Sequence, residues 1–206
     1  MSISRQNLSI VIVTFKSEMV IHECIKSIDN DIKIIIVENS NNSKFINELE
    51  KTYDNVTCVL SLENLGMGAG NNIGIKKAKT DFVLILNPDV ILESSTINEL
   101  IAASKKIINF AILAPISSNV DYPNYKLEEG KKIMIKNNSS FKVASVDGFA
   151  MLFNKKKLDT IIHHNYFDEN FFMYLENDDL CKRIIDANEN IYIIPSSKIR
   201  HLGAMA

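Results

Sequence analysis

The hydrophobic and polar residues of the first half of the chain follow two alternating periods. Residues 8–15 and 32–37 are β-branched apolar runs, which are typical of strands covered by helices on both faces. Residues 17–28, between these runs, carry apolar positions at helical spacing, which predicts a strand–helix–strand unit. The same patterns predict further strands over 56–60, 82–86 and 111–113, and helices over 69–79 and 95–107. This alternation predicts an α/β fold with a mostly parallel, Rossmann-like sheet flanked by helices.

The pattern loosens in the second half of the chain. Residues 121–140 are polar and rich in Asn and Lys, so we interpret them as an excursion of a kind often found over ligand sites. Strand character returns over 143–153, and a helix over 177–187 is followed by a short strand over 191–194. The length of 206 residues indicates a single domain, because one hydrophobic core commonly serves a chain of this size.

Composition narrows the function classes. The chain is 46% hydrophobic and 23% charged, as in globular proteins, and its net charge of -2 gives no electrostatic footprint for nucleic acid. The longest basic run, Lys155–Lys157, is interpreted as solvated surface. No segment has the pattern of a signal peptide or an 18-residue apolar span. We therefore expect a cytoplasmic protein, with peripheral association at the inner face of the cell membrane left open.

The cysteines and glycines exclude several kinds of site. Cys24, Cys58 and Cys181 lack the spacing of a disulfide framework or a zinc site, which indicates a reducing compartment. The turn after the first predicted strand contains no glycine, and Asn71 stands where a GxGxxG fingerprint would need its last glycine. A dehydrogenase and a P-loop NTPase are therefore both disfavoured.

Several ordered segments resemble the family 2 glycosyltransferases, and the rhamnosyltransferase-like branch in particular. The segments are VIVTF, VEN, ENLGMGAGNNIGI, LILNPDV, VDGFAMLF, FDENFFMYLENDDLCKR and residues 195–203. The resemblance implies a GT-A type fold over residues 1–206. In that fold residues 1–114 would form the nucleotide-sugar-binding half, and residues 115–206 the acceptor and catalytic half.

The resemblance also implies a set of donor-binding residues, several of which follow predicted strands. Glu38 stands where the family usually has aspartate, and its carboxylate can accept hydrogen bonds from a base or ribose. Without the resemblance, a less favoured alternative is that Glu38 is a solvated strand-end carboxylate, and the glycine-bearing segment could simply cap a turn. The implied donor-binding residues are Thr14, Phe15, Glu38, Asn64, Gly66, Asn71, Asn72, Asn87, Asp147 and Gly148.

A divalent metal site is implied by Asp89 and His201. Asp89 lies in the Asn-Pro-Asp segment that occupies the place of the family's DxD motif, and His201 resembles a C-terminal histidine of this branch. A carboxylate with an imidazole suits Mn²⁺ or Mg²⁺, and such an ion neutralises a leaving diphosphate. The residue types alone also fit a turn at Asn-Pro-Asp and an ordinary surface histidine.

The catalytic residues are expected at the start of the last predicted helix. The resemblance aligns Asn177 with the family's general base, but a carboxamide has no useful basicity near neutral pH. We therefore predict Glu176 as the base, with Asp178 and Asp179 as the further acidic candidates. The alternative is that Asn177 caps the helix and the two aspartates stabilise its first turn.

The resulting hypothesis is an inverting, metal-dependent hexosyltransferase. It would move rhamnose or a similar sugar from a dTDP- or UDP-sugar donor to a hydroxyl of a cell-surface polysaccharide or glycolipid acceptor. The alternative, motivated by Asn177, is a catalytically weak nucleotide-sugar binding module or partner subunit. The sequence carries no sign of an oligomeric state.

Overall fold

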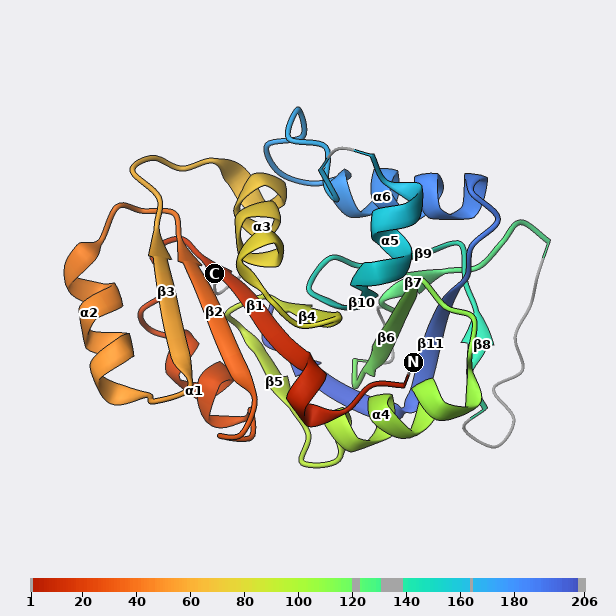
Figure 1. The fold of residues 1–206 in the computed structure, drawn as a ribbon, viewed down its shortest axis with the longest axis horizontal. Coiled ribbons are helices and arrows are strands. Elements are labelled where there is room, and N and C mark those ends of the chain that lie inside the picture. The colour runs from red at the N-terminus through yellow and green to blue at the C-terminus, as the bar shows by residue number, and fades with distance from the viewer. Residues whose placement is uncertain (1, 120–122, 131–138, 164, 204–206) are drawn as a thin grey trace.

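The computed structural model describes residues 2–119, 123–130, 139–163 and 165–203. Within these residues a nine-stranded mixed sheet runs through the molecule, and a two-stranded sheet lies beside it (Figure 1). The strand order is β3-β2-β1-β4-β10-β6-β11-β5, with β8 paired to β11, and β7 pairs with β9 in the small sheet. The bounds are β1 Leu8–Thr14, β2 Lys33–Glu38, β3 Val56–Leu60, β4 Phe82–Leu86, β5 Val90–Leu92, β6 Ile112–Ser117, β7 Tyr125–Lys126, β8 Phe141–Lys142, β9 Ser145–Val146, β10 Ala150–Asn154 and β11 Ile191–His201.

The strands in one half of the large sheet are all parallel, and the other half contains both parallel and antiparallel pairs. Strands β3, β2, β1 and β4 run parallel to one another. Strand β10 then runs antiparallel to both β4 and β6, while β11 is parallel to β6 and antiparallel to β5. Because the carboxyl ends of parallel strands meet at one edge, the loops after β1, β2 and β4 lie together there.

Helices cover both faces of this sheet, and each face has its own apolar layer. Ile10 and Ile12 of β1 belong to one layer and Val11 to the other, as the strand period of two requires. Helices α1, α2 and α4 contribute to the first layer, and α3, α5 and α6 to the second. The helix bounds are η1 Arg5–Asn7, α1 Ile21–Lys26, α2 Ser43–Thr52, α3 Gly66–Lys77, α4 Thr96–Lys106, α5 Lys155–Ile161 and α6 Glu176–Asp186.

Helix α3 approaches β1 closely because two of its residues have no side chain. A Cβ atom on Gly70 would lie 2.8 Å from Val13 Cγ1, and one on Gly74 would lie 2.3 Å from Val11 Cγ1. Such distances are too short for any real Cβ atom, so only glycine permits this helix-to-strand distance. The first turn of α3 is thereby held beside the carboxyl end of β1.

The predicted elements are largely confirmed, with two corrections. The strands expected over 56–60 and 82–86 have the bounds of β3 and β4, and α4 and α6 begin and end within one residue of their predictions. A single strand over 143–153 was wrong, because Asp147 N donates to Asn124 O beside β7 before the chain turns to pair with β4. The strand expected over 191–194 was too short, since β11 continues to His201.

Six elements were not predicted at all, and one prediction is only partly covered. Helices η1, α2 and α5 and strands β5, β7 and β8 had no counterpart in the sequence pattern. In the excursion over 121–140, residues 121–122 and 131–138 lie outside the described residues, while the described part contains β7. No helix among the described residues has both the length and the apolar character needed to cross a bilayer.

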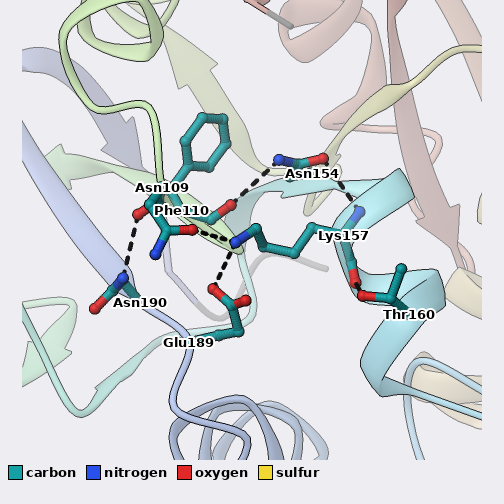
Figure 2. A network of polar contacts seen from close by, with 7 residues as sticks. All are labelled: Asn109, Phe110, Asn154, Lys157, Thr160, Glu189 and Asn190. Atoms are coloured by element: carbon teal, nitrogen blue, oxygen red, sulfur yellow. Dashed lines mark hydrogen bonds and ion pairs between the residues drawn. The ribbon is translucent and has the colours of Figure 1, made fainter.

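The lysine run 155–157 is not a free basic surface. Lys155 Nζ donates to Ala78 O, Lys156 pairs with Asp81 at 3.0 Å, and Lys157 pairs with Glu189 at 2.7 Å. Figure 2 shows Lys157 at the centre of a network that joins α5 to the loops before β6 and β11, through Asn109 and Glu189. A hollow of about 350 Å³ beside this network lies at the opposite sheet edge from the carboxyl ends of β1 and β2.

Candidate functional site

The predicted nucleoside residues meet where β1 and β2 end. Thr14 and Glu38 are register partners at the last position of these strands, so the two side chains belong to adjacent chain ends. Thr14 is fully buried, and its Oγ1 atom has no hydrogen-bond partner within the described structure. A buried hydroxyl without a partner is costly unless something else supplies one, so Thr14 is a candidate ligand contact.

Glu38 is fully buried and is held by its own loop. Its carboxylate accepts hydrogen bonds from Ser40 N at 2.9 Å, from Ser40 Oγ, and from Asn42 N at 2.8 Å. The alternative of a solvated strand-end carboxylate is therefore wrong. Glu38 therefore holds the loop of residues 39–42 in place. Its side chain, one methylene longer than the aspartate usual in the resembled family, accepts hydrogen bonds from two backbone N–H groups of that loop.

The glycine-bearing segment is tied to the neighbouring strand end. Gly66 N donates to Asn64 Oδ1 at 3.0 Å, and Gly66 O accepts from Asn39 Nδ2 at 2.9 Å. Asn71 is buried on α3, and its Oδ1 atom has no partner within the described structure. The segment therefore begins a helix and also presents a buried, unpartnered carboxamide oxygen near the strand ends.

The Asn72 side chain contacts the backbone of the loop before α6. The Asn72 side chain donates to Phe167 O at 2.8 Å and accepts from Phe167 N at 3.0 Å. Asn72 thus fastens the loop before α6 to α3.

Phe15 is 43% exposed just beyond β1, with Lys16 Nζ 5.4 Å from its ring centre, and so it is open to a ligand at the sheet edge.

Asp89 and His201 lie side by side. The antiparallel pairing of β5 with β11 sets His201 opposite Val90, and Asp89 Oδ1 lies 3.2 Å from His201 Nε2. This contact lacks the alignment of a hydrogen bond, so the buried Oδ1 atom has no donor. The His201 ring stacks on Phe149, with ring centres 4.2 Å apart.

This pair fits a hard divalent cation. A buried carboxylate oxygen that lacks a donor, next to an imidazole nitrogen, is the chemistry that Mn²⁺ or Mg²⁺ accepts. Within the described residues no third His, Cys, Asp or Glu completes a set of three, so further ligands would be other oxygens, such as those of substrate, water, a carboxamide or a backbone carbonyl. Asn87 O accepts from Val90 N at 3.2 Å, so the Asn-Pro-Asp segment is also the expected turn.

Asp147 and Gly148 occupy the break between β9 and β10. Burial raises the pKa of Asp147, and Asp178 adds to this effect, whereas Lys126 and His201 oppose it. Asp147 therefore interacts electrostatically with His201, one of the metal candidates, and with Asp178 of α6. A Cβ atom on Gly148 would lie 3.4 Å from Asn177 Cβ, so the small residue also leaves room for Asn177.

The three acidic candidates on α6 have three different environments. Glu176 is 7% exposed, and its Oε2 atom has no partner within the described structure. Asp178 pairs with Lys126 at 2.8 Å, and Asp179 pairs with Arg183 at 2.8 Å on its own helix. Asp179 therefore serves the helix, Asp178 is paired with Lys126 of β7, and of the three only Glu176 has a buried carboxylate oxygen without a partner in the described structure.

The protonation chemistry of Glu176 follows from its burial. Desolvation raises the pKa of its carboxyl group, and Asp178 contributes in the same direction, while a backbone hydrogen bond opposes both. A carboxylate with a raised pKa is a stronger base, which suits proton abstraction near neutral pH. Asn177, by contrast, donates from Nδ2 to Val146 O at 3.0 Å and has a structural contact of its own.

Sequence reasoning missed three residues of this region. Phe149 and Asn39 both lie in segments that carry the family resemblance, VDGFAMLF and VEN, so their signal was present but unused. Lys126, which pairs with Asp178, lies in the loosened segment 121–140, where no periodic pattern singled it out.

Two kinds of comparison with known sequences both match this chain to glycosyltransferases. A family model described as glycosyl transferase family 2 matches residues 9–162. The chain is 29% identical over 203 residues to the low-salt glycan biosynthesis hexosyltransferase Agl10 of Haloferax volcanii, covering 90% of this chain and 64% of that protein. It is 24% identical over 217 residues to the rhamnosyltransferase WbbL of Escherichia coli K12, covering 93% and 82%. The chain thus spans less than two thirds of the archaeal relative.

Comparison with solved structures agrees on the fold. The chain is similar to the crystal structure of GalNAc-T7 with UDP, GalNAc and Mn²⁺, with a TM-score of 0.76 at 15% identity. The match covers 95% of this chain and 43% of that one. The predicted α/β fold of GT-A type, with its mostly parallel sheet flanked by helices, is confirmed.

Proposed function

Because the chain belongs to glycosyl transferase family 2, we propose that it transfers a hexosyl group from a nucleoside diphosphate sugar to a hydroxyl of a saccharide acceptor. Two features of the described structure carry the proposal. One is the buried Asp89 carboxylate against His201, and the other is the buried, unpartnered carboxylate of Glu176. The names of the two sequence relatives, a hexosyltransferase and a rhamnosyltransferase, support the same reaction class.

The donor would bind in the half formed by residues 1–114, and the acceptor in the half formed by residues 115–206. The unpartnered atoms Thr14 Oγ1 and Asn71 Oδ1 would hydrogen-bond the donor, and Phe15 would cover it. The nucleoside would be uridine or thymidine, and the sugar rhamnose or a related hexose. The similar GalNAc-T7 structure was solved with UDP, which supports a uridine donor.

Asp89 and His201 would hold Mn²⁺ or Mg²⁺. The ion would supply positive charge that neutralises the diphosphate as it leaves. The donor-free oxygen of Asp89 supports this assignment, and so does the Mn²⁺ with which the similar GalNAc-T7 structure was solved. Phe149, stacked on the imidazole, would fix the ring orientation of His201.

Glu176 would act as the general base. The acceptor oxygen attacks the anomeric carbon and forms the new glycosidic bond, and its proton passes to the Glu176 carboxylate. The bond from the anomeric carbon to the diphosphate breaks, and its electron pair leaves on the diphosphate oxygen. Such a direct displacement inverts the anomeric configuration, and a positioned base is worth roughly 10²–10⁴-fold in rate.

A donor panel tests this function. UDP- and dTDP-sugars are incubated with the protein, Mn²⁺ and a panel of saccharide acceptors, and nucleoside diphosphate release is measured beside thermal stabilisation. We expect both signals with at least one donor, and loss of release alone in Glu176→Gln. An exposed histidine, His163, supplies the matched control variant His163→Ala, which should behave as the native protein.

The second candidate function is a nucleotide-sugar binding module with weak turnover. It is favoured by one observation: Asn177, at the position of the family's base, is engaged in a hydrogen bond to Val146 O. Thermal stabilisation by a donor without any nucleoside diphosphate release would select this candidate. A cytoplasmic location, with association at the inner face of the cell membrane left open, stays a prediction from the sequence.

A further inference from the structure

At Gly66, the backbone carbonyl of Phe172 occupies the space that a side chain would need. Its φ of +82° lies in the left-handed region, and a Cβ atom there would lie 2.2 Å from Phe172 O. The neighbouring Met67 N donates to the same oxygen at 3.2 Å. The carbonyl of Phe172 is therefore seated directly on the first turn of α3, and only glycine leaves room for it.

Between Phe172 and α6 the backbone takes an unusual path. Tyr174 and Leu175 have φ values of 67° and 69°, so two consecutive residues with side chains are left-handed. This conformation costs an L-residue free energy, and here the side chains recover little of it by packing, because they are 76% and 60% exposed. The path must therefore be fixed by contacts outside these two residues.

The contacts that fix the path come from α3. Asn72 holds Phe167 at the start of the loop, and Gly66 and Met67 hold Phe172 near its end. A Cβ atom on Gly68 would lie 3.6 Å from Glu176 Cβ, so the same turn of α3 also borders the first residue of α6. The loop is thus fastened to α3 at both of these points, and α6 starts directly after its strained stretch.

We propose that Gly66 is a positioning residue for Glu176: its missing side chain lets Phe172 dock on α3, and this docking holds the Glu176 carboxyl group in its buried place. The proposal rests on the proposed function for the role of Glu176 as base, but the docking itself does not depend on it. The donor-binding half thereby sets the environment of a catalytic group in the other half. Asn39 also helps to hold Gly66 in place, because its Nδ2 atom donates a hydrogen bond to Gly66 O.

The displacement caused by a side chain at residue 66 follows from the geometry. Real Cβ atoms essentially never approach another atom within 3.0 Å, so Gly66→Ala must push Phe172 O outward from 2.2 Å. The obstacle is backbone and cannot rotate away. Glu176, four residues further on, should then meet more water, which lowers the pKa that burial now raises.

The test compares Gly66→Ala with Gly130→Ala. Gly130 has a similar φ of +77°, and among the described residues no atom lies within 4 Å of a Cβ position there, so its variant carries the backbone strain without that clash. The pKa of Glu176 is followed by carboxyl ¹³C NMR, with Glu176→Gln assigning the signal. Mn²⁺-dependent UDP affinity and turnover are measured on the same samples.

We expect Gly66→Ala to bring the pKa of Glu176 down toward its ordinary 4.5 and to lower turnover by roughly 10²-fold, as misplacement of about 1 Å does. Gly130→Ala should change neither. A pKa of Glu176 that stays raised in folded Gly66→Ala would overturn the proposal, as would lost UDP binding with an unmoved pKa. If Gly66→Ala does not fold, Asn39→Ala, which removes the support of Gly66 O, must lower the same pKa. If no donor is turned over, the proposed function fails, but the NMR readout still decides the positioning role.

Discussion

Asp89 Oδ1 and His201 Nε2 lie 3.2 Å apart although more than a hundred residues of chain separate them. The antiparallel pairing of β5 and β11 brings them together, and Leu202 N donates to Asp89 O to fix the end of the strand. An acid buried at 1% exposure would be costly without a cationic partner. This relationship gives the first prediction.

Asp89→Asn keeps the shape of the side chain but removes its charge. Mn²⁺-dependent UDP binding, measured by calorimetry, should weaken on the order of 100-fold, because even partners outside the metal's ligand set are worth 10–100-fold in metal affinity. His201→Ala should act in the same direction, whereas His163→Ala should not. UDP affinity that is equal in Asp89→Asn and the native protein, with and without chelator, would remove Asp89 from the metal site.

Glu176→Gln removes basicity and keeps most of the volume. Turnover should fall by roughly 10² or more while UDP affinity stays close to native, since the loss lies in the transition state. Asp178→Asn should cost less, because that carboxylate is already paired with Lys126. If the order of the two variants is reversed, Asp178 is the base. Asn177→Asp tests the weaker-transferase alternative, which gains support from a sharp rise in turnover.

The same residue makes a prediction about stability. Because burial raises the pKa of Glu176, the folded protein binds this proton more tightly than the unfolded chain does. Stability is therefore lost as pH rises from the ordinary value of 4.5 through the folded-state pKa, and the loss stays constant above it. Glu176→Gln should melt at a higher temperature than the native protein near neutral pH and should converge with it below 4.5. The exposed Glu63→Gln supplies the control, with no such pH-dependent difference.

The close approach of α3 to β1 is testable by Gly74→Ala. Helix propensity alone would favour alanine by about 1 kcal/mol. The added Cβ would lie 2.3 Å from Val11 Cγ1 in a fully buried layer, where overpacking costs about 1–3 kcal/mol. Denaturant unfolding should therefore show a net loss of stability. In a double-mutant cycle with Val11→Ala the two losses should be less than additive, and strict additivity would contradict the packing argument.

The hydrophobic pattern predicted the buried strands well because their environment is uniform. Every residue of β1 and β4 is buried, so an apolar run marks each strand along its full length. Helix α2 lacked such a signal, since only Phe45 and Leu49 of its ten residues are buried and its cap Asn42 lies in a run of Ser and Asn that resembles a loop. The last strand was predicted to end at residue 194, but β11 continues past Pro195 with a register shift between Ile194 and Lys198.

The candidate site was predictable only as far as the family resemblance reached. It brought out Asp89 and His201, which the structure places 3.2 Å apart through strands far apart in the chain, and Glu176 at the start of α6. It gave no account of Glu38 as the support of its own loop or of Asn72 as the anchor of Phe167. Those roles depend on hydrogen bonds between segments, which side-chain type and spacing do not encode.

The long β11 strand also sets an order of events during synthesis. Strands β1 to β4 emerge from the ribosome before the rest of the sheet, and the pairing that sets Thr14 opposite Glu38 lies within them. Asp89 must wait for β11, whose pairing with β6 and β5 carries His201 to it. A nascent chain can thus contain the strand pair at the proposed nucleoside site long before it holds the proposed metal pair. Capture of Mn²⁺ by this chain would then report that the whole sheet has assembled.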